Sequence, residues 1–241
     1  MTRQTAITPW SKLSIFCCVA ILSSGLSTAN AQRDLKTFDY QALVKKRSPD
    51  GPPRIGEIVC VGSSHMAIWK TVRKDLAPLT IYNFGIGGTT MKDAADHFAR
   101  ELVIPYKPRA VILYEGSNDI ARDMTPAEIL GHFRRFYGQV RKALPETRFY
   151  VLGIVPSPEE RFEKWETLKQ ANTALQKECN TQPWLTFIDT TTGLIGKDGQ
   201  PRLECFLPKN IHMNAKGYKV WAKAVAPVVV KVEKERVLKE K

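Results

Sequence analysis

The sequence predicts an α/β fold, in which a parallel sheet is covered by helices on both faces. Short apolar runs recur along the chain, and between them apolar residues return with the period of an amphipathic helix. Strands that are apolar throughout are typical of parallel sheets, whose crossover connections are usually helices. The strand candidates span residues 57–61, 79–83, 110–114, 148–154 and 185–188. The helical periods lie at 65–76, 90–102, 125–143, 158–180 and 214–226, and Pro227 is expected to interrupt or end the last helix.

The first 31 residues are typical of a secretory signal peptide. The basic residues Arg3 and Lys12 precede an apolar run at 13–22. Ala29-Asn30-Ala31 is a small-x-small cleavage site. The apolar run is too short to span a bilayer, which takes about 20 residues. We therefore expect export to the periplasm or the extracellular space, with no stable membrane insertion after the signal is removed. An uncleaved anchor is the alternative interpretation.

Composition predicts one sizeable hydrophobic core in the 241 residues, of which 43% are hydrophobic. The polar stretch 32–54 predicts a tether, 55–230 the domain, and 231–241 a charged C-terminal tail. The net charge of +12 falls to +10 without residues 1–31, which carry two basic residues and no acid. Acidic residues are interleaved with these charges, so we interpret them as solvated surface and expect no nucleic-acid partner.

Cysteine usage excludes a disulfide scaffold. Of the five cysteines, only Cys60, Cys179 and Cys205 lie beyond the predicted signal, and three cysteines permit at most one disulfide.

Small polar turns follow the first three predicted strands, at residues 62–65, 85–89 and 115–119. The carboxyl ends of parallel strands meet at one edge of a sheet, so these turns should converge there. In the first turn, Ser64 is a candidate nucleophile, because a tight strand-to-helix turn exposes a hydroxyl at a helix N-terminus. The competing interpretation is that Ser63 and Ser64 only cap the helix.

The other two turns offer hydrogen-bond donors for an oxyanion. The Gly87-Gly88 turn can bring a backbone N–H close to a ligand, and Asn118 can supply a side-chain amide. Ordinary turn roles are the alternative, as is phosphate binding, although 85–88 does not match the full dinucleotide fingerprint. Among the four histidines, only His212 lies in a loop just before the final predicted helix, which makes it the candidate general base.

Taken together, segments 61–64, 83–88, 116–119 and 211–214 resemble the sequence blocks of the SGNH hydrolases, also called GDSL-like lipases and esterases. The resemblance covers about residues 56–230. It implies a flavodoxin-like three-layer α/β/α sandwich with a five-stranded parallel sheet, and neither metal nor cofactor. It also implies a carboxylic-ester hydrolase acting on a small-molecule or carbohydrate ester, with small acyl groups transferred to Ser64. In that family pattern, His212 is the base, while Gly88 and Asn118 belong to the oxyanion hole.

The sequence departs from the family pattern at the acid, which stands three residues before the histidine. Lys209 occupies that position, and an ammonium group cannot accept the imidazole N–H. Three hypotheses remain: a backbone carbonyl, Glu204 or Asn210 orients His212; the protein is a slow dyad enzyme; or catalysis is impaired and a ligand- or carbohydrate-binding role remains. Acyl transfer to a sugar acceptor would use the same residues.

Two further side chains are expected at the mouth of the site. Tyr114 ends the third predicted strand and Glu115 follows it, so both are predicted to bind substrate. For Tyr114 the alternative is packing in the core, where an aromatic residue at a strand end is more often found.

Overall fold

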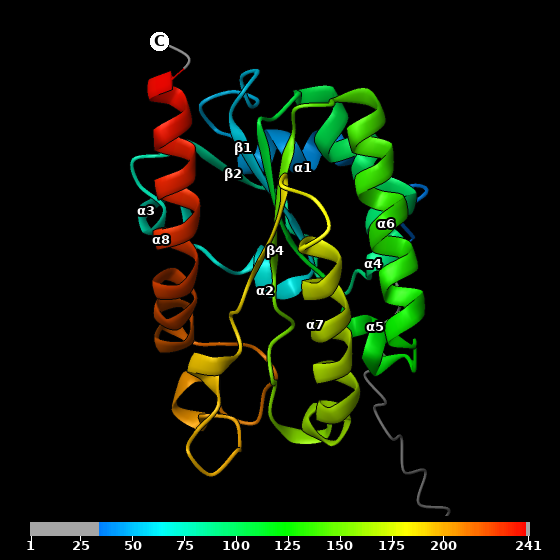
Figure 1. The fold of residues 1–241 in the computed structure, drawn as a ribbon, viewed down its shortest axis with the longest axis vertical. Helices are drawn as coiled ribbons and strands as arrows, with labels where there is room; N and C mark the ends of the chain where they lie inside the picture. The colour runs from blue at the N-terminus through cyan, green and yellow to red at the C-terminus, as the bar shows by residue number, and fades with distance from the viewer. Residues whose placement is uncertain (1–33, 240–241) are drawn as a thin grey trace, which may run out of the picture. The chain divides into compact units, whose positions relative to one another are not determined.

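The computed structural model describes residues 34–239, so the predicted signal peptide at 1–31 lies outside the described residues. A five-stranded parallel sheet with the order β2-β1-β3-β4-β5 forms the centre (Figure 1). The strands are β1 (Ile58–Gly62), β2 (Ile81–Asn83), β3 (Ala110–Tyr114), β4 (Arg148–Leu152) and β5 (Leu185–Ile188). The predicted α/β fold and its five parallel strands are confirmed.

Helices cover both faces of the sheet. In Figure 1, α6 and α7 stand on one side of the strands and α8 on the other. The first face carries α1 (Tyr40–Arg47), the π-helical segment η1 (Ala94–Val103), α6 (Pro126–Ala143) and α7 (Trp165–Cys179). The second face carries α2 (Ser64–Ala67), α3 (Val72–Asp75) and α8 (Ala215–Lys239).

Successive side chains of each strand point to opposite faces of the sheet, and this alternation produces two hydrophobic cores. In β1, Val59 and Val61 pack into the first core, whereas Ile58 and Cys60 pack into the second. All four side chains are fully buried, which explains why the strand is apolar throughout rather than at every second residue.

Short elements complete the chain between the larger ones. They are α4 (Met91–Asp93), η2 (Ile104–Tyr106), α5 (Ser117–Ala121), η3 (Glu159–Lys164), η4 (Thr192–Leu194) and η5 (Leu203–Cys205). The predicted helix at 65–76 is therefore divided into α2 and α3, and the one at 158–180 begins as the 3-10 turn η3. No helix among residues 34–239 is both long and apolar enough to cross a bilayer.

The predicted tether at 32–54 is wrong over its described part. Helix α1 lies within it, and Tyr40 and Val44 on this helix are buried in the first core. The Asp39 side chain caps the helix by accepting a 2.7 Å hydrogen bond from the Ala42 N–H. Because its apolar residues join the core, this segment belongs to the domain.

The C-terminal boundary is also corrected. Helix α8 continues through Pro227 to Lys239, although an internal proline costs about 3 kcal/mol. Val225 and Val229 are fully buried on either side of the proline, and tertiary packing of this kind supplies most of a helix's stability in a protein. The expected free tail at 231–241 therefore continues a core helix over its described part.

Glu233 shows how firmly the end of α8 is held. Its carboxylate is fully buried and accepts hydrogen bonds from Arg148 at 2.7 and 2.8 Å, from Arg109 at 2.8 Å and from the Tyr150 hydroxyl at 2.6 Å. Arg109 and Arg148 lie at the amino ends of β3 and β4, so this network ties α8 to the sheet edge remote from the three polar turns.

Candidate active site

The first turn presents Ser64 because Gly62 permits an unusual backbone. Gly62 has φ +147°, and a Cβ at this position would lie 2.1 Å from the Tyr114 carbonyl oxygen. Only glycine allows so close a contact between β1 and β3. Ser63 then holds the N-cap position of α2 without a capping hydrogen bond from its side chain. The capping interpretation of Ser63 is thus not supported, and Ser64 begins the helix.

Ser64 and His212 meet across 148 residues of sequence. The His212 Nε2 lies 2.8 Å from the Ser64 Oγ, which is hydrogen-bonding distance. This contact brings the candidate base and the candidate nucleophile together.

Asn210 orients the His212 ring. Its Oδ1 lies 2.9 Å from the backbone N–H of His212 and 2.8 Å from the ring Nδ1. An N–H group requires an acceptor, so the backbone contact identifies this atom as the amide oxygen. The same oxygen then accepts the Nδ1–H, which leaves Nε2 unprotonated and able to receive the Ser64 proton.

The acceptor beside the ring Nδ1 belongs to Asn210 and not to Lys209. Lys209 has an exposed side chain, and its backbone adopts φ +48°, a left-handed conformation that turns the chain before Asn210. Lys209, at the family's acid position, therefore does not orient His212, and the neighbouring Asn210 supplies the acceptor. Of the three orienting groups left open by the sequence, Asn210 is the one found.

Hydrogen bonds to both the nitrogen and the oxygen of its amide group fix the Asn118 side chain. Its Nδ2 donates to the Thr89 carbonyl at 2.8 Å, and its Oδ1 accepts from Arg161 at 3.3 Å. An amide nitrogen has two hydrogens, so one N–H remains for another acceptor.

Gly87 lies beside the candidate nucleophile, because a Cβ there would be 3.8 Å from the Ser64 Cβ. Gly88 follows with φ +83°, and its carbonyl is fixed by Arg122 at 3.0 Å.

Arg161 joins the candidate site, although the sequence motifs do not indicate it. It extends from η3 and donates to the Ser117 carbonyl at 2.8 Å as well as to Asn118. Burial, and then the positive charge of Arg161, hold the pKa of His212 below its usual 6.5. No periodicity or motif marks Arg161, because its role depends on the path of the chain after β4.

His65 supports the loop that carries His212, the candidate base. Its ring is buried 5.2 Å, centroid to centroid, from that of His212, and its Nε2–H donates to the Ile211 carbonyl at 3.1 Å. The Tyr218 hydroxyl donates to the His65 carbonyl at 2.7 Å. Burial is the main cause that lowers the pKa of His65 to about 3, so the ring stays neutral. Its position beside Ser64 in sequence was the only signal for this role.

The predicted substrate contacts of Tyr114 and Glu115 are corrected. Both side chains are buried, with exposures of 0% and 1%. The Thr89 hydroxyl donates to the Glu115 carboxyl at 2.7 Å. Burial and the neighbouring Asp119 raise the pKa of Glu115 well above its ordinary value, which favours the neutral acid. Glu115 therefore links the third turn to the second from within the core, whereas the Tyr114 ring packs against Trp221 with centroids 4.9 Å apart.

Residues 59–220 match the GDSL-like Lipase/Acylhydrolase family. The chain belongs to this family. Since the match spans most of the domain, the resemblance seen in the four sequence segments is confirmed, and so is the class of hydrolases that act on ester bonds.

Proteins that are similar to this chain match most of its length. The human platelet-activating factor acetylhydrolase IB subunit alpha2 is 24% identical over 191 residues, covering 74% of this chain and 78% of its own. A GDSL-like lipase from Bacteroides thetaiotaomicron has a similar structure, with a TM-score of 0.66 and 14% sequence identity, covering 80% of this chain and 98% of its own. A carbohydrate esterase family 3 protein from Talaromyces cellulolyticus has a TM-score of 0.56 and 17% sequence identity, covering 75% of this chain and 99% of its own. At these identities, the two structures support the fold alone.

Proposed function

We propose that this GDSL-like protein is a serine esterase that forms an acyl-enzyme at Ser64. The 2.8 Å contact between the Ser64 Oγ and the His212 Nε2 carries the proposal. The third member of the triad is Asn210, whose neutral amide oxygen sets the tautomer of the base without adding negative charge.

The arrangement supports a two-step acyl transfer. His212 takes the Ser64 proton as the Oγ attacks the ester carbonyl and forms a C–O bond. The negative charge moves to the carbonyl oxygen, where the N–H groups of Ser64, Gly88 and Asn118 would stabilise it. His212 then protonates the departing alcohol as its C–O bond breaks. Water, deprotonated by His212, releases the carboxylic acid and frees Ser64 for another cycle.

The substrates we propose are esters of small acyl groups, including carbohydrate esters. The similarity to an acetylhydrolase and to a carbohydrate esterase supports this choice. The alternative of a catalytically impaired relative loses its main support, because Asn210 provides the acceptor that Lys209 lacks. Export also stays a proposal, supported by the signal-like segment 1–31; recovery of a mature N-terminus at Gln32 from a secreting host would test it.

Hydrolysis of p-nitrophenyl acetate by the wild type and by Ser64→Ala tests the proposed reaction. We expect the enzymatic rate to be lost in Ser64→Ala, and a fluorophosphonate probe to label only the wild type, with mass spectrometry locating the adduct at Ser64. Equal rates in the two proteins, or no labelling at Ser64, would reject the esterase and favour a binding role.

A further inference from the structure

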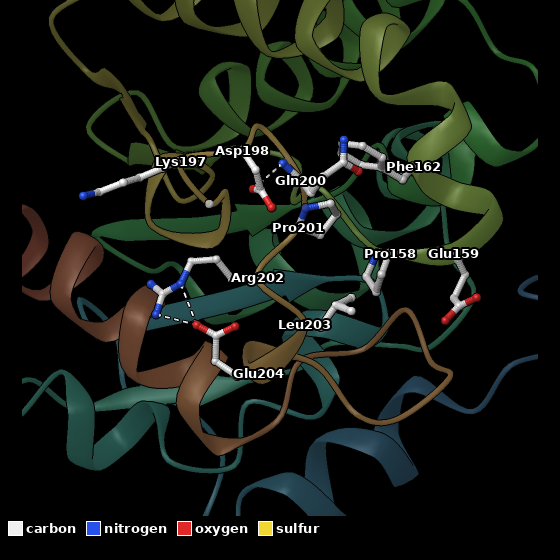
Figure 2. Close-up of a pocket in the computed structure, with 11 residues that line it drawn as sticks. Pro158, Glu159, Phe162, Lys197, Asp198, Gln200, Pro201, Arg202, Leu203 and Glu204 are labelled. Atoms are coloured by element: carbon white, nitrogen blue, oxygen red, sulfur yellow. Dashed lines mark hydrogen bonds and ion pairs between the residues drawn. The ribbon is translucent and has the colours of Figure 1, made fainter.

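A hollow of ≈ 940 Å³ lies beside the segments that carry the site, yet none of the residues that line it takes part in the proposed catalysis. One wall comes from the start of η3 and includes Pro158 and Phe162. The other comes from the loop after β5, at residues 196–204 (Figure 2). Its volume lies within the range of about 300–1,000 Å³ that is usual for small-molecule sites.

Both walls are bonded directly to catalytic segments. Arg161, one residue before Phe162, donates to Asn118. On the opposite wall, the Glu204 carbonyl accepts a 2.9 Å hydrogen bond from Asn214, two residues after His212. The hollow is thus anchored on one side to the oxyanion donor and on the other to the loop of the base. A group bound here would extend from an ester held at Ser64.

The lining combines apolar surfaces with polar groups of both signs. Phe162 stacks on Trp165 with centroids 5.9 Å apart, and Leu203 is 67% exposed although it is a large apolar residue. Arg202 is paired with Glu204 at 2.8 Å (Figure 2). The charged lining residues are Glu159, Lys197, Asp198, Arg202 and Glu204, a net charge of −1 from two cations and three anions.

This chemistry fits a neutral, polyhydroxylated ligand. A pyranose ring has C–H faces that pack on Phe162 or Leu203, and hydroxyl groups that bond to carboxylates and amides such as Gln200. An anionic phospholipid headgroup would meet more negative than positive side chains. A long acyl chain needs a mostly apolar channel, whereas this hollow has five charged residues around it.

We propose that the hollow binds the alcohol portion of the substrate, and that this portion is a neutral glycan. The inference rests on the proposed esterase function and adds to it a leaving-group site with its own residues. Phe162 and Leu203 then determine specificity toward the alcohol and have no part in the chemical steps at Ser64.

Two variants of the full-length enzyme test the site with two kinds of substrate. Leu203→Glu and Phe162→Ala are compared with the wild type on p-nitrophenyl acetate and on partly O-acetylated cellotriose, xylotriose and mannotriose. Ile55→Glu is the matched control, because Ile55 is also apolar and exposed, at 77%, but precedes β1 at the other end of the strands.

We expect kcat/KM for the acetylated trisaccharide that is the best substrate to fall about 3- to 10-fold in both variants, as for the loss of one aromatic or apolar contact. The rate on p-nitrophenyl acetate should stay within about 2-fold of wild type, and Ile55→Glu should resemble wild type on both. Parallel losses on both substrates would show that the variants disturb the catalytic site and would overturn the proposal. So would unchanged rates on the trisaccharides, or hydrolysis of p-nitrophenyl acetate without hydrolysis of any trisaccharide.

A binding measurement separates this proposal from the proposed function. Saturation-transfer NMR with the three unacetylated trisaccharides and Ser64→Ala protein should give a signal that Leu203→Glu weakens in the same background. If that signal is seen while the wild type hydrolyses no ester, the glycan site stands and the esterase fails. If no trisaccharide gives the signal, the glycan site is rejected whatever the esterase result.

Discussion

Replacing Asn210 by aspartate should make the enzyme faster, and by a limited factor. The Asn210 Oδ1 is 2.8 Å from the His212 Nδ1, so a carboxylate in the same place would bond to the ring directly. A hydrogen bond to a charged group contributes about 1.5–3 kcal/mol, against about 0.5–1.5 for a neutral one. The gain of about 1–1.5 kcal/mol as imidazolium forms corresponds to a roughly 5- to 15-fold increase in kcat/KM.

The increase in kcat/KM is limited because His212 already has the productive tautomer, protonated at Nδ1, in the wild type. In a chymotrypsin-type triad, asparagine in place of aspartate costs about 10⁴-fold in rate because the ring takes the wrong tautomer. Here the backbone N–H of His212 fixes the Asn210 oxygen toward the ring, so that penalty is absent.

The assay is kcat/KM for p-nitrophenyl acetate from pH 5 to 9 in Asn210→Asp, Asn210→Ala and the control Lys209→Asp. The added carboxylate should also move the acidic limb of the profile to higher pH, because it favours protonated His212. Lys209→Asp should change the rate little, since that side chain is exposed. A gain near 10⁴-fold in Asn210→Asp would refute the tautomer assignment, and an unchanged rate in Asn210→Ala would refute the orienting role.

Three further perturbations address the surroundings of the site and the core. In Arg161→Gln, loss of the cation should raise the pKa of His212 and move the acidic limit of kcat/KM to higher pH, whereas Arg161→Lys should keep most of the effect; coincident pH profiles would contradict this. Glu233→Ala leaves Arg109 and Arg148 without their buried partner, so it should lower the free energy of unfolding by about 3–5 kcal/mol. Urea titrations measure this, and a loss below about 1 kcal/mol would count against the stabilising role of the network. His65 has a folded pKa of about 3 and an unfolded value near 6.5, so the unfolded state binds the extra proton between these values and stability falls as pH falls. His65→Gln should remove up to about 1.4 kcal/mol per pH unit of that slope, and parallel stability curves would show that His65 does not cause it.

Apolar patterning alone was enough to predict the sheet. A strand such as β1, buried on both faces, must be apolar throughout, and this signal is local enough to be read from five consecutive residues. The positions of Ser64 and Asn118 were also predictable, because the carboxyl ends of parallel strands lie at a common edge. His212 was predictable from its place in the loop before the last helix.

The boundaries of the domain required the tertiary structure. Residues 34–54 and 231–239 are rich in polar residues, yet Tyr40, Val44 and Glu233 are buried by elements distant in the sequence. Local composition cannot show that a glutamate will meet two arginines from strand ends, nor that packing will carry a helix through Pro227.

The orientation of His212 is the clearest case of a property that depends on the three-dimensional structure. The sequence places Lys209 at the family's acid position and leaves Asn210 as one of several possible substitutes. The left-handed backbone at Lys209 turns the chain so that the next side chain faces the ring. A backbone angle of this kind depends on how the whole loop is held, including the His65 contact with Ile211, and not on residue type alone.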